Sequence, residues 1–265
     1  MDVKAKLQEL LANMMKYNTG CMSRECFGFE PDTVYDAVVV APGWKPAKII
    51  HDSTCRITEL AQHSYFSGYL VEKDGLKIAW AQTASGACNV LDHCLIFAEL
   101  QFKKMIFVGA VGSLVPEFDI GDLCTPESCI AGVYAHQYLR SDLRDFMPME
   151  TVFPDAEYVA HVVSLAEKNG YELRKAKVFC TDSISCEYSH LDEIRATGAQ
   201  LIEMETSTFY QLADLFDVPA IALLAVSDNS ATGQPLLGMD RTQHERYNDT
   251  RSNIVPDLIL RLAKE

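Results

Sequence analysis

The sequence contains no long apolar run and no excess of positive charge. No uninterrupted apolar stretch of the 265-residue chain approaches the roughly 20 residues of a membrane-spanning helix. The formal net charge is −14, which argues against attraction to nucleic acid or to anionic membranes. It leaves room for one anionic small molecule at a local cationic site. We therefore expect no nucleic acid and no membrane among the partners of this protein.

Metal-binding and redox motifs are missing as well. The seven histidines form neither an HxH nor an HExxH pattern, so we predict no metal site. The nine cysteines are odd in number and have no CxxC spacing. Most of those from Cys88 to Cys186 lie among apolar residues, where a thiol packs as a small hydrophobic group. We expect a reduced, cytoplasmic protein.

The chain also lacks the features that separate domains. It has no Pro/Gly/Ser-rich linker, no internal repeat and no low-complexity tract. The N-terminal segment MDVKAKLQELLANMMKY lacks the apolar core of a secretion signal and predicts an amphipathic helix. We expect residues 1–35 to form this helix and an irregular connector, and residues 36–265 to form a single domain with a full core.

Apolar runs alternate with helix-like segments along the rest of the chain. Strands are predicted at 36–41, 65–73, 76–83, 103–114, 120–134, 175–181, 200–202 and 218–229, with a hairpin turn at Asp74-Gly75. Helices are predicted at 88–100, 156–169, 189–197 and 206–216 and at the C-terminus. This alternation predicts an α/β fold, a mixed and mostly parallel central sheet with helices on both faces.

Ligands of such sheets bind at the carboxyl ends of the strands. Small or reactive residues occupy the predicted ends Gly43–Lys45, Thr83–Gly86, Gly109–Gly112, Glu203–Glu205 and Ser227–Asn229. If these ends share one rim, the two glutamates face a pocket that also contains Asp228. A structural interpretation stands beside this one. Acids in the first turn of a helix interact favourably with its dipole by about 0.3–1 kcal/mol, and Asp228 could cap a helix.

Two acids at one rim suit the cleavage of the bond between a sugar and a nucleobase. The sugar becomes oxocarbenium-like in the transition state, so a nearby carboxylate lowers the barrier. The departing base gains negative charge, so a general acid should protonate one of its ring nitrogens. Glu205 and Asp228, at separate strand ends, fit these two roles.

The segment LIEMETSTFYQLADLFDVPAIALLAVSDN resembles the signature of the nucleoside phosphorylase and nucleosidase superfamily. In that family an acid-Met-Glu segment opens a helix, and a later strand ends in Ser-Asp. Other segments match in order: VVVAPGWKPAKI, HSYFSGYLVEKDGLKIAWAQTASGA, ELQFKKMIFVGAVGSLVPEFDIGDL and VFCTDSIS. The resemblance extends from about Asp36 to the C-terminus, and the family includes purine and uridine phosphorylases and methylthioadenosine nucleosidases.

The resemblance implies a role for each matching residue. Glu205 would bind the ribose 2′- and 3′-hydroxyls, and Asp228 would protonate the purine, with Ser227 beside it. Ile184 falls where many members have a base-stacking phenylalanine. The further substrate-binding residues that it implies are Met204, Glu203, Thr83, Ala84, Ser85, Gly109, Ala110, Gly43, Lys45 and Arg241.

Arg241 lies where purine phosphorylases carry an arginine that assists the acid. Arg246 is an alternative, because the local alignment shifts by a few residues. For both arginines, a solvated position on a helix face is at least as good an interpretation.

The residues that bind phosphate in phosphorylases are missing. Those enzymes use arginines at three places and one hydroxyl, where this chain has Lys45 or Lys48, Ser64, Phe107 and Ala110. Without bidentate arginines a dianion is bound weakly, because a lysine supplies only a point charge. Hydrolytic members activate water with a glutamate near the first turn, roughly where Lys45 stands. Phosphate as a co-substrate and water both stay open as the sugar acceptor, and no other cofactor is implied.

The leading hypothesis is an enzyme that cleaves the N-glycosidic bond of a nucleoside, with a purine nucleoside as the expected substrate. A non-catalytic nucleoside-binding protein that retains Glu205 and Asp228 stays open as the alternative. A dinucleotide-dependent oxidoreductase is excluded, because GAVGSL lacks the GxGxxG pattern and follows a central strand. The family also implies a homo-oligomer, either a dimer or a hexamer.

Overall fold

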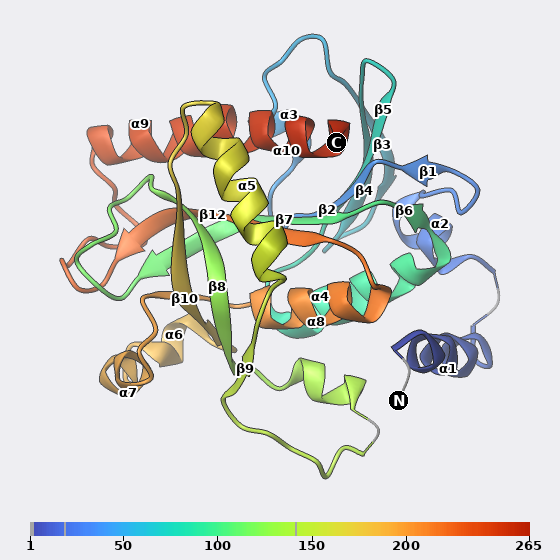
Figure 1. Ribbon diagram of the computed structural model, residues 1–265, viewed down its shortest axis with the longest axis horizontal. Helices are drawn as coiled ribbons and strands as arrows, with labels where there is room; N and C mark the ends of the chain where they lie inside the picture. Colours follow the sequence, from blue (N-terminus) through green and yellow to red (C-terminus); the bar gives the residue numbers. More distant parts are fainter. Residues whose placement is uncertain (1–2, 19, 141) are drawn as a thin grey trace.

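The computed structural model describes residues 3–18, 20–140 and 142–265. One large mixed sheet lies between two layers of helices, with a small two-stranded sheet beside it (Figure 1). The predicted fold class is confirmed: α/β with a mixed sheet whose central strands pair mainly in parallel.

The large sheet has the strand order β11-β10-β8-β12-β7-β2-β5-β4-β3, and β9 pairs with β8. Its strands are β2 (Ala37–Val40), β3 (Arg56–Gln62), β4 (Ser67–Lys73), β5 (Leu76–Gln82), β7 (Met105–Ser113), β8 (Leu123–Gly132), β9 (Glu150–Val152), β10 (Leu173–Thr181), β11 (Leu201–Glu203) and β12 (Ala220–Asn229). The small sheet pairs β1 (Val34–Tyr35) with β6 (Gln101–Phe102).

One half of the large sheet closes into a ring. Strand β7 pairs in parallel with β12, and β10 pairs in parallel with β8 and β11. A short antiparallel pairing joins β12 to β8, and a second one places Ile202 of β11 opposite Gly112 of β7. The ring thereby brings the ends of β7, β11 and β12 to one place, as the predicted common rim requires.

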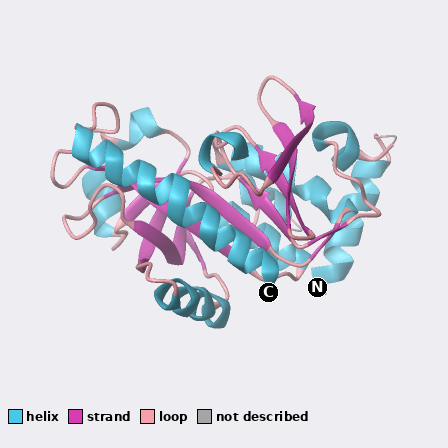
Figure 2. Cartoon of the chain, turned by 90° about the horizontal axis from the view of Figure 1, so that it is seen from above, coloured by secondary structure: helices cyan, strands magenta, loops and turns pink. Residues whose placement is uncertain are grey.

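Helices cover both faces of the sheet (Figures 1 and 2). The side chains of β7 show why, since successive residues point to opposite faces. Met105 and Phe107 pack into the core beneath α4 (Ala87–Leu95) and α8 (Thr206–Phe216). Ile106 and Val108 pack into the second core, beneath α5 (Ala156–Lys168) and α10 (Val255–Lys264). The remaining helices are α1 (Val3–Met15), α2 (Met22–Phe27), α3 (Pro46–Ile49), η1 (Ile96–Glu99), η2 (Ala135–Leu139), α6 (Ile184–Glu187), α7 (Leu191–Ala196), α9 (Arg241–Asp249) and the π-turn Thr250–Ile254, which joins α9 to α10.

Two segments differ from the prediction. The connector before Asp36 is not irregular throughout, because it contains α2 and places Phe27 and Phe29 in the core, stacked on each other at 5.4 Å. Strand β3 was not predicted, because its residues are mostly exposed and show no apolar alternation. It is an edge strand that pairs with β4 alone, and charged side chains are typical of such edges.

The predicted hairpin is confirmed between β4 and β5, where Asp74 and Gly75 both have positive φ, as a type I′ turn requires. No helix within the described ranges is long and apolar enough to cross a membrane. The nine cysteines are free thiols. Cys88 and Cys186 are exposed, whereas Cys94, Cys124, Cys129 and Cys180 are buried as the sequence predicts.

Candidate active site

A cavity of about 150 Å³ lies at the ends of β7, β11 and β12. Many of the residues predicted for the site line it together: Ser85, Ala110, Ile184, Glu203, Met204, Glu205, Ser227 and Asp228. The structure therefore brings the acid-Met-Glu segment, the Ser-Asp strand end and the small-residue loop to one place.

Other residues predicted for the site do not line this cavity: Gly43, Lys45, Thr83, Ala84, Gly109 and Arg241. The loop after β2 reaches the rim only indirectly, because the backbone N–H of Gly43 donates to the carbonyl of Thr83 at 2.9 Å. Gly109 faces the core, since a Cβ there would lie 3.0 Å from the ring of Phe107.

The two candidate arginines are on the surface of α9. The side chain of Arg241 is 92% exposed and pairs with Glu245 at 2.8 Å. Arg246 pairs instead with Asp122 at 3.1 Å and holds α9 against the turn before β8. The structure thus agrees with the interpretation of both residues as helix-surface charges.

Glu203 closes the start of α8. Its Oε2 atom accepts hydrogen bonds from the backbone N–H groups of Glu205 at 2.6 Å and Thr206 at 2.8 Å. Its Oε1 atom accepts from the Thr206 hydroxyl at 2.8 Å and from the Cys180 thiol at 2.7 Å. These N–H groups have no partner within the helix, so Glu203 satisfies them in the way that an N-cap side chain does.

Glu205 is equally buried, but its carboxylate points away from the helix that it precedes. Its Oε1 atom accepts a hydrogen bond from the backbone N–H of Gly86 at 2.5 Å. Gly86 has a φ of +103°, in the region that favours glycine, and this conformation presents its N–H to the carboxylate. Burial, and secondly the charge of Glu203, raise the pKa of Glu205 well above its usual range.

Asp228 owes its position to an irregularity in β12. The register with β7 shifts between Val226 and Asp228, so that Asp228 lies opposite Gly112. Such a bulge changes the direction of a side chain. A larger residue opposite would displace this carboxyl group, because a Cβ on Gly112 would lie 2.9 Å from Asp228 Oδ2. Burial raises the pKa of Asp228. The hydrogen bond that its Oδ1 accepts from the Ser227 hydroxyl at 2.7 Å lowers the pKa and opposes part of this rise.

A third carboxyl group, from Glu187, lines the same cavity. Glu187 is the last residue of α6, whose start is capped by Ser183: its hydroxyl accepts from the Cys186 N–H at 3.2 Å. Burial raises the pKa of Glu187 to about 7, and the charge of Asp228 contributes to this rise. Glu187 was not predicted, because it lies two residues beyond the matching segment VFCTDSIS.

The cavity has no positive side chain among the described residues that line it. Its apolar lining comes mainly from Ile184, Ile202, Met204 and Leu236, and Tyr188 adds an aromatic ring. Within the described part of the chain, no group of three or more His, Cys, Asp or Glu side chains could hold a metal ion. The arrangement suits a neutral or cationic molecule with an apolar portion and hydroxyl groups.

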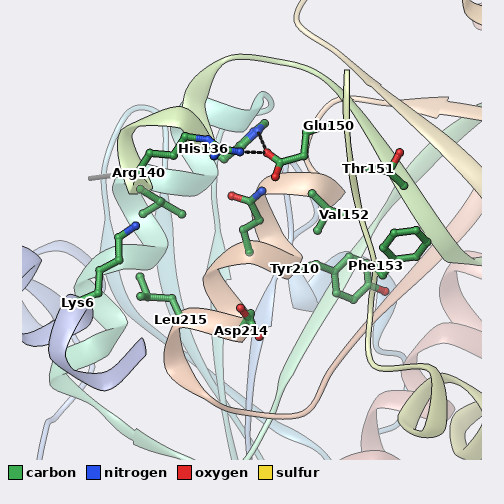
Figure 3. A pocket seen from close by; sticks show the side chains of 12 residues that line it. Lys6, His136, Arg140, Glu150, Thr151, Val152, Phe153, Tyr210, Asp214 and Leu215 are labelled. Atoms are coloured by element: carbon green, nitrogen blue, oxygen red, sulfur yellow. Dashed lines mark hydrogen bonds and ion pairs between the residues drawn. The ribbon is translucent and has the colours of Figure 1, made fainter. Parts of the chain in front are cut away.

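A larger cavity of about 520 Å³ lies elsewhere, between α1, η2, β9 and α8 (Figure 3). Glu150 there pairs with Arg140 at 2.5 Å and lies 3.5 Å from the Nε2 atom of His136. Lys6 and Asp214 extend from α1 and α8 into the same region. This cavity shares no lining residue with the one at the strand ends and contains none of the residues predicted for the site.

Comparison with known proteins agrees with the motifs. The family model of the phosphorylase superfamily matches residues 37–259. A DeoD-type purine nucleoside phosphorylase from Bacillus velezensis is 30% identical over 175 residues, 66% of this chain and 73% of the relative. A second one, from Exiguobacterium sibiricum, is 26% identical over 148 residues, and the match spans 56% of this chain and only 60% of that relative.

A nucleosidase is also similar. The 5′-methylthioadenosine/S-adenosylhomocysteine nucleosidase of Desulfotalea psychrophila is 23% identical over 180 residues, 66% of this chain and 75% of the relative. Among solved structures, the corresponding nucleosidase of Campylobacter jejuni superposes with a TM-score of 0.68 at 18% identity, covering 85% of this chain and 97% of the other. At this identity the superposition establishes the fold and not the substrate.

Proposed function

Because the chain belongs to the phosphorylase superfamily, as its motifs predict, we propose that it cleaves the N-glycosidic bond of a purine nucleoside. The observation that carries the proposal is the placement of Glu205 and Asp228 in one cavity at the strand ends. Glu205 is buried beside the small-residue loop that contains Gly86, and Asp228 lies near the end of β12, which pairs with β7. A sugar and a base could contact these two carboxyl groups at the same time.

Glu205 would act on the sugar. Its carboxylate accepts one backbone hydrogen bond, from Gly86, and can accept the 2′- and 3′-hydroxyls of a ribose as well. In the transition state the ribose carries positive charge, which an ionised Glu205 stabilises. Binding of the hydroxyls favours the ionised form and opposes the rise in pKa caused by burial.

Asp228 would act on the base. As the bond between C1′ and the ring nitrogen breaks, its electron pair moves to the base, and Asp228 supplies a proton to a ring nitrogen. The raised pKa of Asp228 helps it to hold that proton in the unliganded site. Ser227, 2.7 Å from Asp228 Oδ1, fixes the orientation of the carboxyl group.

Water is the acceptor that we propose for the sugar. The cavity lining offers no cation for a phosphate dianion, and Phe107 is 1% exposed and belongs to the core. Ser64, Lys45 and Lys48 do not line the cavity either. Water would add to C1′ and lose a proton to Asp228, which restores the acid, so that the products are free ribose and the neutral base. Neither phosphate nor any other cofactor enters this reaction.

The test is incubation with a panel of nucleosides, with and without phosphate, followed by analysis of both products. We expect free base and free ribose, at rates that phosphate changes little. Stoichiometric ribose 1-phosphate, with saturation at millimolar phosphate or below, would contradict hydrolysis and would keep the bond cleavage. Tight binding without release of any base would instead favour the non-catalytic alternative. The expected homo-oligomer and cytoplasmic location belong to this proposal as well, and light scattering would measure the former.

A further inference from the structure

Glu187 is a carboxyl group in the cavity that the proposed reaction does not use. It ends α6, one residue before Tyr188, and its side chain is half-buried. No described residue donates a hydrogen bond to its carboxylate or forms an ion pair with it. A half-buried carboxylate without a hydrogen-bond partner can accept hydrogen bonds from a molecule in the cavity.

The position of Glu187 places it toward a base rather than toward a sugar. The sugar end is marked by Glu205 and Gly86, which are bonded to each other across the rim. Glu187 is on the same short helix as Ile184, which would stack on the base. The charge of Asp228, which would protonate the base, contributes to the raised pKa of Glu187. The apolar Leu236 and the ring of Tyr188 line the same cavity.

We propose that Glu187 is a specificity-determining residue, whose carboxylate accepts an N–H donor of the nucleobase. This inference rests on the proposed function and adds a substrate class to it. The preferred nucleosides carry an N–H donor on the base, as an exocyclic amino group or a lactam N–H. A purine without such a group is disfavoured, because it leaves the carboxylate without a hydrogen-bond partner.

The chemistry of the two carboxyl groups supports this choice of donor. Like charges that share a cavity repel each other, so one of the two tends to keep a proton. In the unliganded site the charge of Asp228 raises the pKa of Glu187, so the two carboxyl groups compete for one proton. An N–H donor of the base favours the ionised form of Glu187 and thereby leaves the proton to Asp228, which can pass it to the ring nitrogen. An acceptor atom on the base would instead keep the proton on Glu187 and leave Asp228 without one to donate. The site therefore favours a donor.

The experiment compares three nucleosides in the wild type and in Glu187→Gln. Adenosine and inosine carry N–H donors on the six-membered ring, and purine riboside carries none. We expect the wild type to prefer the first two by about 10-fold or more in kcat/KM. In Glu187→Gln this preference should fall to within about 3-fold, because an amide oxygen is a weaker acceptor than a carboxylate. Because each ratio is compared between variants, intrinsic differences in leaving-group reactivity cancel.

Glu193→Gln is the matched control. It makes the same chemical change on the adjacent α7, where the side chain of Glu193 is 79% exposed and pairs with His190. This variant should keep the wild-type preference. Glu187→Asp, which retains the charge, is a second variant in case Glu187→Gln fails to fold, and it should keep more of the preference than Glu187→Gln.

An unchanged preference in Glu187→Gln, with normal turnover, would overturn the inference and leave the proposed function intact. If the wild type cleaves no nucleoside, the proposed reaction falls. Calorimetric titration with inosine and purine riboside then decides the role of Glu187 in recognition. Weaker binding of inosine by Glu187→Gln, with unchanged binding of purine riboside, supports the inference, whereas equal effects on both overturn it.

Discussion

The carboxylate of Glu203 accepts a hydrogen bond from the backbone N–H of Glu205 at 2.6 Å, so these neighbouring acids have separate tasks. Glu203 also bonds to the N–H and the hydroxyl of Thr206 and thereby holds the first turn of α8. Glu205 leaves this helix and bonds to Gly86 on another loop. The helix-start interpretation therefore suits Glu203, and the ligand interpretation suits Glu205.

Glu205→Gln should lower kcat/KM by about 10²–10³-fold, because only the charged side chain stabilises a cationic sugar. The shape of the side chain and its bond to Gly86 can be retained, since the amide oxygen also accepts hydrogen bonds. The melting temperature should therefore change little. Release of free base measures the first effect, and thermal unfolding followed by circular dichroism measures the second.

Glu203→Gln is the control for this variant. Its carboxylate accepts four hydrogen bonds, from two N–H groups, a hydroxyl and a thiol, and an amide can satisfy only part of this set. We expect a loss of about 1–3 kcal/mol in the free energy of unfolding. Wild-type turnover in Glu205→Gln, or a stability loss confined to that variant, would remove Glu205 from the reaction.

Asp228→Asn should affect substrates according to their leaving groups. An amide cannot donate the proton that a purine needs, so cleavage of purine nucleosides should slow by about 10²–10⁴-fold. A riboside with a nitrophenolate leaving group needs no proton and should keep most of its rate. Steady-state kinetics with both substrates measure the difference. Equal losses on the two would show that Asp228 acts by holding the ends of β7 and β12 rather than as an acid.

Much of the fold could be predicted because its signals are local. The nearly continuous apolar run of β7 and the turn at Asp74-Gly75 depend on neighbouring positions in the sequence. Strand β3 has no such signal, because its pairing with β4 comes from the position of an edge and not from its own residues. Phe27 and Phe29 were likewise hidden, since a short aromatic segment reveals its packing only when the surrounding strands are in place.

The site divides in the same way. Glu205 follows the apolar strand β11 and Asp228 lies near the end of the apolar strand β12, and both positions can be read from the sequence. The position of Glu187 depends on how a four-residue helix folds over the cavity, which no periodicity reveals. The need for glycine at Gly112 depends on a register shift in β12, a contact between strands far apart in sequence. Arg241 occupies the place where the resemblance implies a substrate-binding arginine, but its side chain is exposed to solvent.

Stability should depend on pH through Glu187. Its pKa is raised from 4.5 to about 7 in the folded protein, by burial and by Asp228, and Tyr188 lies beside it. Between pH 4.5 and about pH 7, Glu187 holds a proton in the folded state that it has lost in the unfolded state. The stability of the folded protein therefore falls as the pH rises through this range. Glutamine cannot ionise. The melting temperature of Glu187→Gln relative to wild type should therefore be higher at pH 8 than at pH 5.

Thermal unfolding at a series of pH values checks this prediction. Glu193→Gln again serves as the control, because Glu193 is exposed on the adjacent helix. The difference in melting temperature between Glu193→Gln and wild type should stay constant with pH. If the difference in melting temperature between Glu187→Gln and wild type is also constant with pH, Glu187 is solvated and ionised in the folded protein.

Phe107→Arg should not turn the protein into a phosphorylase, although it restores an arginine at a place where the family carries one. The Phe107 side chain is 1% exposed and packs on Phe209, with a ring separation of 5.4 Å. An arginine there would be an uncompensated charge in the core beneath α8, at a cost of about 3–5 kcal/mol. Phosphate should have no more effect on base release than in wild type, and the melting temperature should fall.

Ala110→Arg places the same group at the exposed position within β7, in the lining of the cavity, and should keep the fold. Product analysis and thermal unfolding of both variants test this prediction. Ribose 1-phosphate formed by a stable Phe107→Arg protein would contradict it. That result would mean that residue 107 faces the site and that one arginine is enough to bind phosphate.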